Sequence, residues 1–569
     1  MFTFWLLTNP AHADWPSGAE IPGAITADVT PEGLDAITGI IPALVPPEVA
    51  IPEVHLADDS CSWLGCLYEY SVDFTNGKAF IAVNTIDIEP ATGVLDLTAS
   101  LNLSLNSAAD PSHLDVDATA IGFISINESC DVWLEPVNIN LFVSVQLTLL
   151  PDGTVDAYVP TPGWSWTLDA DDIVLADCLI GDIVDILDYV GIEPYDLIIQ
   201  QLEPAIDDAI AGLGPTIESA LEDAFGSIGT IEGSVDLLGA PLDYALTPSE
   251  ITIVPEGVRI GISGTFATTP HPCVAQYGIT ESLATTGTAT AVGTWPTTIG
   301  YTPHLIIDAD DDMVNQALFA VWQSGILCQT IDSSAAADLG IPIAIDTGLL
   351  NLLAPGVYDT LFAETGPLVL ALVPRLPPVA SPQGTSDINV AIDELGVDFL
   401  AELDGRMVRV VGIDLEVDAG ADLSFDNATG LLAIAIALGE DAIKPTIGFN
   451  ELVPDASATI ADSFGNLFST LVGPLLGSAL GDLSFPMPAF LGYGVTSLDV
   501  EATGNLDLDP SGGQGDHLGI FATIGPATYV STGCSCSDPA ASTCDTGGGR
   551  GLSLLGLLTA AVVARRRKG

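Results

Sequence analysis

One order of elements occurs twice along the 569 residues, and it constrains the fold more than any single motif. Each half opens with a helix start, continues with long segments of alternating apolar and polar residues, and ends with a long apolar helix. The predicted helix starts lie at positions 31 and 181 in the first half and at 309 and 456 in the second, spacings of 150 and 147 residues. This self-similarity indicates an internal duplication.

In the first half, Thr30-Pro31-Glu32 supplies a cap residue, a first-turn proline and a first-turn acid, which predicts a helix start. Leucines alternate with polar residues over 95–105, the period of a strand. A second helix is predicted over about 180–225, segmented by prolines. The apolar residues chosen from these two helices are Leu34, Ile37, Ile41, Ile183, Leu187, Leu202 and Ile206.

In the second half, the acids at 308–312 are favoured by the dipole of a helix that is expected to end at Gly325. Alternation over 413–425 predicts a strand, and a long helix is predicted over about 456–480. The apolar residues chosen from these two helices are Val314, Leu318, Val321, Phe464, Leu467 and Leu471.

A highly curved antiparallel sheet that wraps around a long apolar helix forms a tube. The sequence therefore predicts an α+β fold class with two elongated barrels of this kind. We expect the thirteen apolar residues above to line elongated pockets of the kind that suit acyl chains. The alternative is that these apolar stripes simply fill a closed core.

The charge balance excludes several classes of partner. The chain has 76 acidic and 11 basic residues, a net charge of −65, and five of the basic residues lie in the last twenty positions. The remaining six cannot neutralise a nucleic-acid backbone or attract anionic lipid headgroups. With 48% hydrophobic residues the chain is not disordered, so most acidic groups must face water or hold cations.

Both ends resemble export signals. Ala11-His12-Ala13 is a small-x-small cleavage site, so residues 1–13 are interpreted as the remnant of a signal peptide, although an ordinary buried segment is the alternative. Residues 533–569 contain Cys534 and Cys536, a short apolar run over 551–564 and a terminal basic cluster. This tail resembles the MYXO-CTERM sorting signal.

The tail resemblance implies export, cleavage by a sorting protease and retention at the cell surface or outer membrane, with lipid on Cys534 or Cys536. The apolar run would span about 21 Å as a helix, less than the roughly 30 Å hydrocarbon core, so a short transmembrane helix is expected. A plain C-terminal membrane anchor is the alternative reading.

Cysteine usage agrees with export. Six of the nine cysteines lie before the tail, and an oxidising compartment favours disulfides. Sequence order suggests three pairs, which are one of fifteen pairings: Cys61–Cys66, Cys130–Cys178 and Cys273–Cys328.

No motif makes a case for catalysis. The six histidines form no His-Glu-x-x-His helix, and neither a Gly-x-Ser-x-Gly elbow nor a phosphate-binding glycine loop with lysine occurs. His271-Pro272-Cys273 fits a loop better than a nucleophile pair. The acids at 308–312 could hold calcium through oxygen ligands, and 507–516 is a weaker candidate. An acidic helix N-terminus in water is the simpler interpretation of 308–312, so no metal ligand is assigned.

Three segments together resemble the lipid-binding proteins related to bactericidal/permeability-increasing protein, the tubular lipid-binding superfamily. Residues 29–37 look like the opening helix of the family, and 304–327 look like the strand, acidic turn and apolar helix that open its second domain. Residues 481–488 look like its late proline turn, although this chain has Ser484-Phe485 before Pro486-Met487-Pro488. Cys130 and Cys178 also fall where the family has a disulfide.

The resemblance implies a first lipid-binding barrel over 20–267, a linker and central sheet over 268–301, and a second barrel over 302–530, related by a pseudo-twofold axis. Each barrel would hold a phospholipid or fatty acid without catalysis. The acidic composition argues against the cationic tip of the bactericidal members. We therefore expect an exported lipid-binding or lipid-transfer protein with no cofactor beyond bound lipid. The alternative is an acidic structural protein or adhesin stabilised by calcium.

Overall fold

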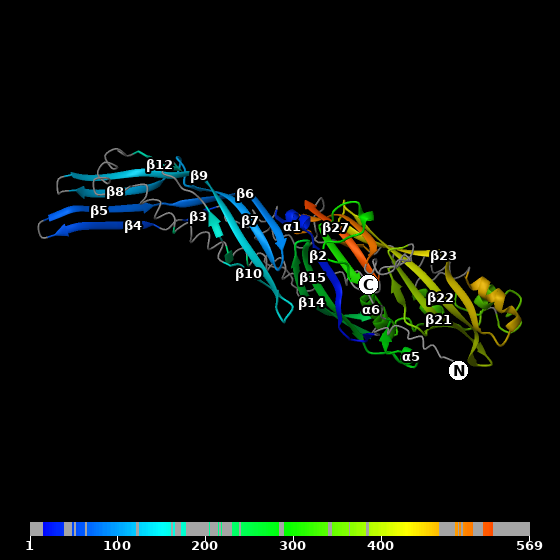
Figure 1. Cartoon of the computed structure of the whole chain (residues 1–569). Coiled ribbons are helices and arrows are strands. Elements are labelled where there is room, and N and C mark those ends of the chain that lie inside the picture. The colour runs from blue at the N-terminus through cyan, green and yellow to red at the C-terminus, as the bar shows by residue number, and fades with distance from the viewer. Residues whose placement is uncertain are drawn as a thin grey trace, which may run out of the picture. The chain divides into compact units, whose positions relative to one another are not determined.

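The described part of the chain is mostly β-structure with few helices (Figure 1). A computed structural model describes residues 15–38, 48–50, 53–62, 65–120, 124–160, 163–165, 172–177, 204, 214–215, 218, 230–237, 240–283, 289–338, 344–363, 365–382, 386–465, 484–486, 489–490, 493–503 and 516–526. The predicted helix over 180–225 and most of the one over 456–480 lie outside these ranges, although 457–465 is helical.

The chain divides into two compact units, which are described separately. Unit 1 comprises residues 1–30, 228–251 and 258–569, and unit 2 comprises 31–227 and 252–257. Large antiparallel sheets form the framework of both units.

Unit 2 contains a ten-stranded sheet with the order β3-β6-β7-β9-β8-β5-β4, and β10, β11 and β12 also pair with β9. The strands are β3 (Glu48–Ala50), β4 (Val54–Ser62), β5 (Gly65–Thr75), β6 (Lys78–Ala91), β7 (Val94–Leu105), β8 (Ser112–Ala120), β9 (Ile124–Leu149), β10 (Val155–Tyr158), β11 (Gly163–Ser165) and β12 (Ile173–Ala176). Helix α1 (Pro31–Thr38) packs against β6 and begins where the Thr30-Pro31-Glu32 pattern predicts.

An eight-stranded sheet lies mainly in unit 1 and has the order β13-β14-β15-β2-β17-β27-β26-β25. Its strands are β2 (Ile21–Val29), β13 (Ile231–Leu237), β14 (Ala240–Val254), β15 (Gly257–Thr268), β17 (Leu305–Asp310), β25 (Ala489–Phe490), β26 (Tyr493–Thr503) and β27 (His517–Pro526). Strand β2 lies between β15 and β17, so this sheet joins segments from both halves of the sequence.

A seven-stranded sheet completes unit 1, with the order β18-β19-β21-β22-β23-β24 and β20 paired to β21. Its strands are β18 (Thr330–Ile331), β19 (Leu368–Pro374), β20 (Val379–Ser381), β21 (Ile388–Leu403), β22 (Arg406–Asp426), β23 (Leu431–Phe449) and β24 (Ser484–Pro486). In the predicted alternation over 413–425, Ile413, Leu415 and Val417 are buried and the later apolar residues are half-buried.

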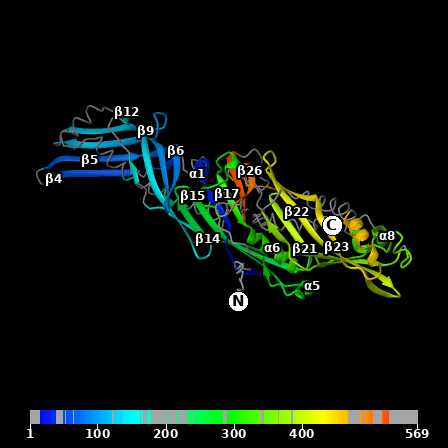
Figure 2. The same ribbon diagram turned by 45° about the vertical axis from the view of Figure 1, so that its right-hand side comes forward.

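Short helices lie between strands of unit 1, among them α5, α6 and α8 (Figure 2). They are α5 (Pro272–Ala275), η3 (Thr297–Ile299), α6 (Asp311–Gln323), α7 (Ser333–Asp338), α8 (Gly348–Leu353) and η4 (Pro454–Ala456). A two-stranded pair joins β1 (Trp15–Pro16) to β16 (Glu281–Ser282). Within the predicted linker over 268–301, the described segments therefore include α5, β16 and η3.

Helix α6 follows the sequence prediction closely. Asp310 caps it by accepting a hydrogen bond from the backbone N–H of Asp312 at 3.0 Å. Asp311 and Asp312 lie in its first turn, where negative charge is favoured by the helix dipole. The helix gives way to a turn in which Gly325 has φ +76°, a left-handed conformation that suits glycine.

Candidate functional site: the covered apolar faces

The inner face of the ten-stranded sheet is the candidate lipid site of unit 2. The predicted period of two in β7 is confirmed, because Leu95, Leu97, Ala99, Leu101, Leu103 and Leu105 are all buried. Strand β9, the antiparallel neighbour of β7 in the sheet, continues the same face. Five register pairs join the two strands there: Leu95↔Val145, Leu97↔Val143, Ala99↔Leu141, Leu101↔Ile139 and Leu103↔Val137. Paired residues share a face of a sheet, so these buried side chains form one aliphatic surface.

This aliphatic surface, defined by the five pairs, extends to other strands. On one side Val116 pairs with Val72 and Leu114 with Phe74, and all four side chains are buried. In the described part of unit 2, the buried polar side chains are those of Asn106 and Ser112. The aliphatic surface therefore offers dispersion contacts and hydrophobic burial.

The opposite face of the same sheet is polar. Ser100 on β7 and Asn138 on the neighbouring strand β9, which are diagonal neighbours in the register, exchange side-chain hydrogen bonds of 3.1 and 3.2 Å. Ser144 donates a hydrogen bond of 2.5 Å to the carboxylate of Asp96, and Thr98 between them is exposed. The alternation thus separates a water-facing side from a covered aliphatic side.

The described residues of the predicted pocket set are distributed over three places. Leu34 on α1 and Phe464 in the helical segment 457–465 are buried, with exposures of 3% and 5%. Val314 is buried on α6, whereas Leu318 and Val321 are partly buried there. The remaining side chains lie outside the described part of the structure: Ile37, Ile41, Ile183, Leu187, Leu202, Ile206, Leu467 and Leu471.

Helix α6 is covered on two sides. Val314, Leu318 and Val321 belong to the cluster between α6 and the eight-stranded sheet. Phe319 and Trp322 belong to a second cluster, with ring centroids 5.7 Å apart. The three predicted α6 residues thus pack into a core in the described structure.

Polar side chains fix α6 in this position. Gln316 accepts from the backbone N–H of Phe266 at 2.9 Å and donates to the carbonyls of Ala19 and Pro16 at 2.9 and 3.3 Å. Asn315 accepts from the N–H of Ala380 at 2.7 Å, and the indole N–H of Trp322 donates to the carbonyl of Pro374 at 3.1 Å. These bonds hold a helix whose surroundings leave little free space.

A third apolar cluster lies against the seven-stranded sheet. Phe399 on β21 meets Phe464 edge-on, with ring centroids 6.1 Å apart and an angle of 84°. Ile413 and Leu415 on β22 are fully buried in the same cluster, as is Leu353 of α8. Phe464 therefore contacts a closely packed aromatic and aliphatic core.

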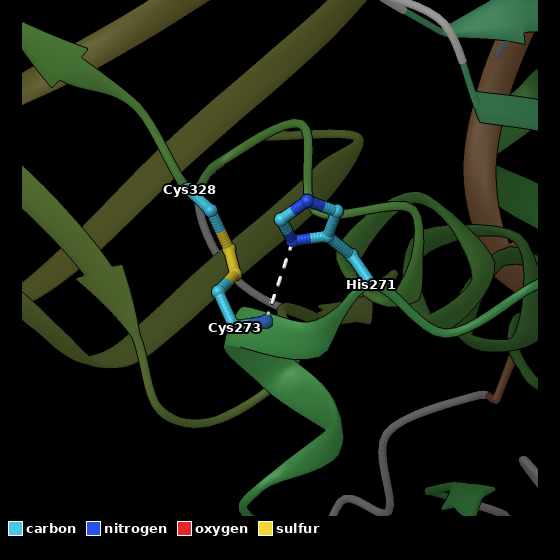
Figure 3. Close-up of side chains that lie close together, drawn as sticks. All are labelled: His271, Cys273 and Cys328. Atoms are coloured by element: carbon cyan, nitrogen blue, oxygen red, sulfur yellow. Dashed lines mark hydrogen bonds between the residues drawn. A yellow bond between two sulfur atoms is a disulfide. The ribbon is translucent and has the colours of Figure 1, made fainter.

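The Cys273–Cys328 disulfide that sequence order suggested is present (Figure 3). Its Cα atoms are 6.5 Å apart, and His271 accepts a hydrogen bond from the N–H of Cys273 at 3.3 Å. The three side chains lie close together, but both sulfurs are committed to each other. They are therefore unavailable as thiolate nucleophiles or metal ligands while the bond is intact.

The other predicted cysteines are only partly described. Cys61 and Cys130 are disulfide-bonded, and Cys61 is the register partner of Cys66 in the β4–β5 ladder. The side chains of Cys66 and Cys178 lie outside the described structure, as do Cys534 and Cys536.

A buried polar cluster lies on the eight-stranded sheet, and sequence reasoning identified only its 308–312 part. His517 accepts or donates a 2.8 Å hydrogen bond with Asp516 and lies 3.8 Å from a carboxylate oxygen of Asp310. Asp308 accepts hydrogen bonds from the hydroxyls of Thr503 and Thr290.

The pKa values of two members of this cluster, Asp310 and His517, are raised. Burial raises the pKa of Asp310 to about 6, although His517 opposes the shift. Burial alone lowers the pKa of His517, but the hydrogen bond with Asp516 and the charges of Asp308 and Asp310 raise it overall. The carboxylates of Asp310, Asp311 and Asp312 are close enough together to surround a cation. Their positions are also explained by the cap and first turn of α6.

A buried ion pair continues the polar face of the eight-stranded sheet. Arg259 donates two hydrogen bonds of 2.6 Å to the carboxylate of Asp28, whose side chain is 2% exposed. Burial nevertheless raises the pKa of Asp28 above its ordinary value. These two residues are 231 positions apart, so no local sequence signal could have paired them.

Among the described residues, no helix has the length and apolar character required to cross a membrane. The predicted tail helix over 551–564 falls outside that range.

Comparisons with known proteins show weak structural likeness. No protein-family model and no curated protein sequence matches the chain. The crystal structure of lipopolysaccharide binding protein is similar, with a TM-score of 0.49 and 13% identity over 90% of this chain and 99% of that chain. P47 of Clostridium botulinum E1 gives 0.24 and 8%, over 90% and 99% of the two chains. Epiphyas postvittana Takeout 1 gives 0.21 and 10%, over 34% and 89%.

Proposed function

We propose that the protein is an exported lipid-binding or lipid-transfer protein that holds acyl chains of phospholipid or fatty acid against covered apolar faces, without catalysis. The observation that carries the proposal is the aliphatic surface of unit 2, with its five consecutive register pairs of buried aliphatic side chains. The family resemblance of residues 29–37, 304–327 and 481–488 supports the same function.

The dimensions and chemistry of the aliphatic surface suit an acyl chain. Strand β7 has 12 residues, which corresponds to about 40 Å at roughly 3.3 Å per residue. Each buried CH2 group would contribute about 0.8 kcal/mol, so a long saturated chain would be held firmly. The aliphatic surface would select lipids by the length of the acyl chain and would not discriminate between headgroups.

The proposal includes no reaction step. The buried members of the aliphatic surface carry no acid, base or nucleophile. Asp310 and His517, whose pKa values are raised, belong to the eight-stranded sheet, where Asp310 caps α6 and His517 bonds with the adjacent Asp516. In the wider proposal, the barrels wrap around the predicted long helices, and the 533–569 tail retains the protein at the cell surface.

Native mass spectrometry of the protein purified from an exporting host, followed by organic extraction, tests this function. We expect phospholipid or fatty acid at one or two molecules per chain. Ala99→Trp should reduce the lipid count because Ala99 lies on the aliphatic surface. Thr98→Trp is the matched control, because the neighbouring side chain points to the exposed face.

Circular dichroism would establish that both variants fold, and Ala99→Leu offers a milder obstruction. A protein that remains free of lipid after incubation with mixed lipids would contradict the proposal. Equal lipid counts for folded Ala99→Trp and Thr98→Trp would move the site away from unit 2. Lipid-free protein strongly stabilised by calcium would favour the structural adhesin.

A further inference from the structure

Arg406 differs from every other basic residue in the described structure. Five of the six described lysines and arginines form ion pairs with aspartates: Lys78–Asp110, Arg259–Asp28, Arg375–Asp414, Arg409–Asp398 and Lys444–Asp418. Arg406 is exposed and has no ion pair among the described residues. No carboxylate of the described residues pairs with Arg406, so in a chain with a net charge of −65 its guanidinium is a cation that can contact an external anion.

Arg406 lies at the tip of the β21–β22 hairpin, residues 402–407, which we call the hairpin tip. Asp404 and Gly405 form its two-residue turn with φ of 51° and 75°, the conformation that the right-handed strand twist favours. Leu403 and Met407 flank the turn with exposures of 38% and 46%. The register pairs Leu403 with Arg406 and Glu402 with Met407, so an apolar side chain is present on each face.

Further exposed apolar side chains belong to the same end of unit 1. The N–H of Glu402 donates to the carbonyl of Pro367 at 3.3 Å, and the N–H of Thr347 donates to the adjacent Gly366 at 3.0 Å. Helix α8 begins directly after Thr347 and exposes 61% of Leu352. The hairpin tip and α8 are thus connected through residues 366–367.

Exposed apolar residues are concentrated around this end. Nine large apolar side chains of the described chain are markedly exposed. Leu403 and Met407 lie on the hairpin tip, and Leu352 and Leu361 directly precede Leu353 and Phe362, which are buried members of the seven-stranded sheet's cluster. Leu452 directly precedes Val453, which is partly buried and packs against the same cluster. Such concentration is typical of a surface that meets another apolar phase.

We propose that the hairpin tip docks on a zwitterionic phospholipid surface. Leu403 and Met407 would enter the boundary between headgroups and acyl chains, and the guanidinium of Arg406 would bind the phosphate. The carboxylates of Glu402 and Asp404 would face the cationic ammonium of the same headgroups. This arrangement matches both charges of a zwitterionic lipid, whereas an anionic surface repels a chain of charge −65.

The docking surface goes beyond the proposed lipid-holding function and does not depend on it. If the protein holds no lipid, the hairpin tip would still be a membrane-contact element. If it does hold lipid, the hairpin tip would be the place where the protein contacts the membrane that supplies or receives that lipid. The two proposals therefore fail separately.

Hydrogen exchange of the full chain, with and without phosphatidylcholine vesicles, tests the docking surface locally. We expect slower exchange in peptides that cover 402–407 when vesicles are added, and no change at the β9–β10 turn over 150–154. The double variant Leu403→Ser/Met407→Ser should lose the protection. It should also weaken vesicle binding through the tip by about tenfold, because several buried CH2 groups are removed.

Leu150→Ser is the matched control, because Leu150 is a 41% exposed leucine at another hairpin turn. It should leave the protection of 402–407 unchanged. The positive φ positions 404 and 405 are untouched in these variants, so the turn is retained. Unaltered exchange at 402–407 with vesicles, or protection that survives in the double variant, would overturn the proposal.

The role of Arg406 has its own readout. Arg406→Gln should lose part of the protection on phosphatidylcholine, whereas Arg406→Lys should retain most of it, since the phosphate contact requires a cation. Protection that is stronger on phosphatidylglycerol vesicles than on phosphatidylcholine would contradict the choice of a zwitterionic surface. Identical behaviour of the glutamine and lysine variants would remove Arg406 from the docking surface.

Discussion

The ten-stranded sheet of unit 2 and the eight-stranded sheet of unit 1 bury opposite kinds of chemistry. The first covers an aliphatic face and turns its polar face to water. The second packs an apolar face on α6 and also buries a polar face that carries Asp28, Arg259, Asp308 and His517. An aliphatic face accepts many neighbours of suitable volume, whereas each buried charge requires a specific partner.

This difference separates two tasks. The contacts of Asp28 and Asp308 are directional: Asp28 on β2 binds Arg259 on the neighbouring strand β15, and Asp308 on β17 accepts a hydrogen bond from Thr503 on β26. The aliphatic surface imposes no direction on whatever covers it, so in the proposed function a flexible acyl chain would take the place of protein side chains there. A binding face and a structural face can thus be distinguished by the chemistry that each buries.

The largest expected effect comes from breaking the buried ion pair. Arg259→Met leaves the 2% exposed carboxylate of Asp28 without its cation. We expect the free energy of unfolding to fall by about 3–5 kcal/mol, measured by urea denaturation. The double variant Arg259→Met/Asp28→Leu should lose much less, because no uncompensated charge remains. Equal losses in both variants would show that the unpaired carboxylate of Asp28 is not the cause of the loss.

A smaller effect is expected on the aliphatic surface. Leu101→Ala removes a side chain that is 4% exposed and should lower the free energy of unfolding by about 2–4 kcal/mol in lipid-free protein. Thr98→Ala, on the exposed face of the same strand, should change it by less than about 1 kcal/mol. Thermal denaturation compares the pair. A loss for Thr98→Ala that matched Leu101→Ala would remove the distinction between the two faces.

The smallest effect is the pH dependence that the polar face contributes. The folded-state pKa of Asp310 is raised from 3.8 to about 6, so its stabilising contribution is full below about pH 4 and is lost as pH rises through about 6. The pKa of His517 is also raised from 6.5, so its contribution is lost above that pH. Urea denaturation should show lower stability at pH 8 than at pH 5.

Asp310→Asn should flatten the part of this dependence between pH 4 and 6 by at most about 3 kcal/mol. Glu256→Gln, at the exposed β14–β15 turn of the same sheet, is the control and should leave the profile unchanged. A profile that kept its slope in Asp310→Asn would place the titration elsewhere.

Local periodicity predicted those helices and strands that depend on residues close together in the sequence. The alternation over 95–105 became β7, and the acids before Val314 became the cap and first turn of α6. The Cys273–Cys328 bond also followed from sequence order. These features depend on nearest neighbours or on a limited number of pairings, so a sequence contains enough information to indicate them.

The polar face and the hairpin tip were not predicted, for a different reason. The pairing of Asp28 with Arg259 and the meeting of Asp310 with His517 exist only after strands far apart in the chain join one sheet. Arg406 can be distinguished only after the other described lysines and arginines have been matched with their aspartates in the folded structure. Such features depend on which residues, far apart in the sequence, become neighbours in the folded chain.

The central position of β2 in its sheet also determines how long after its synthesis this strand can pair. Val29 pairs with Val258 on one side of β2 and with Leu305 on the other. Neither edge of β2 can form its hydrogen bonds until these partners, about 230 and 280 positions later in the chain, have been synthesised. At roughly 5–20 residues per second, that delay is on the order of 10 to 60 seconds. Throughout this interval β2 exposes unpaired strand edges that invite aggregation.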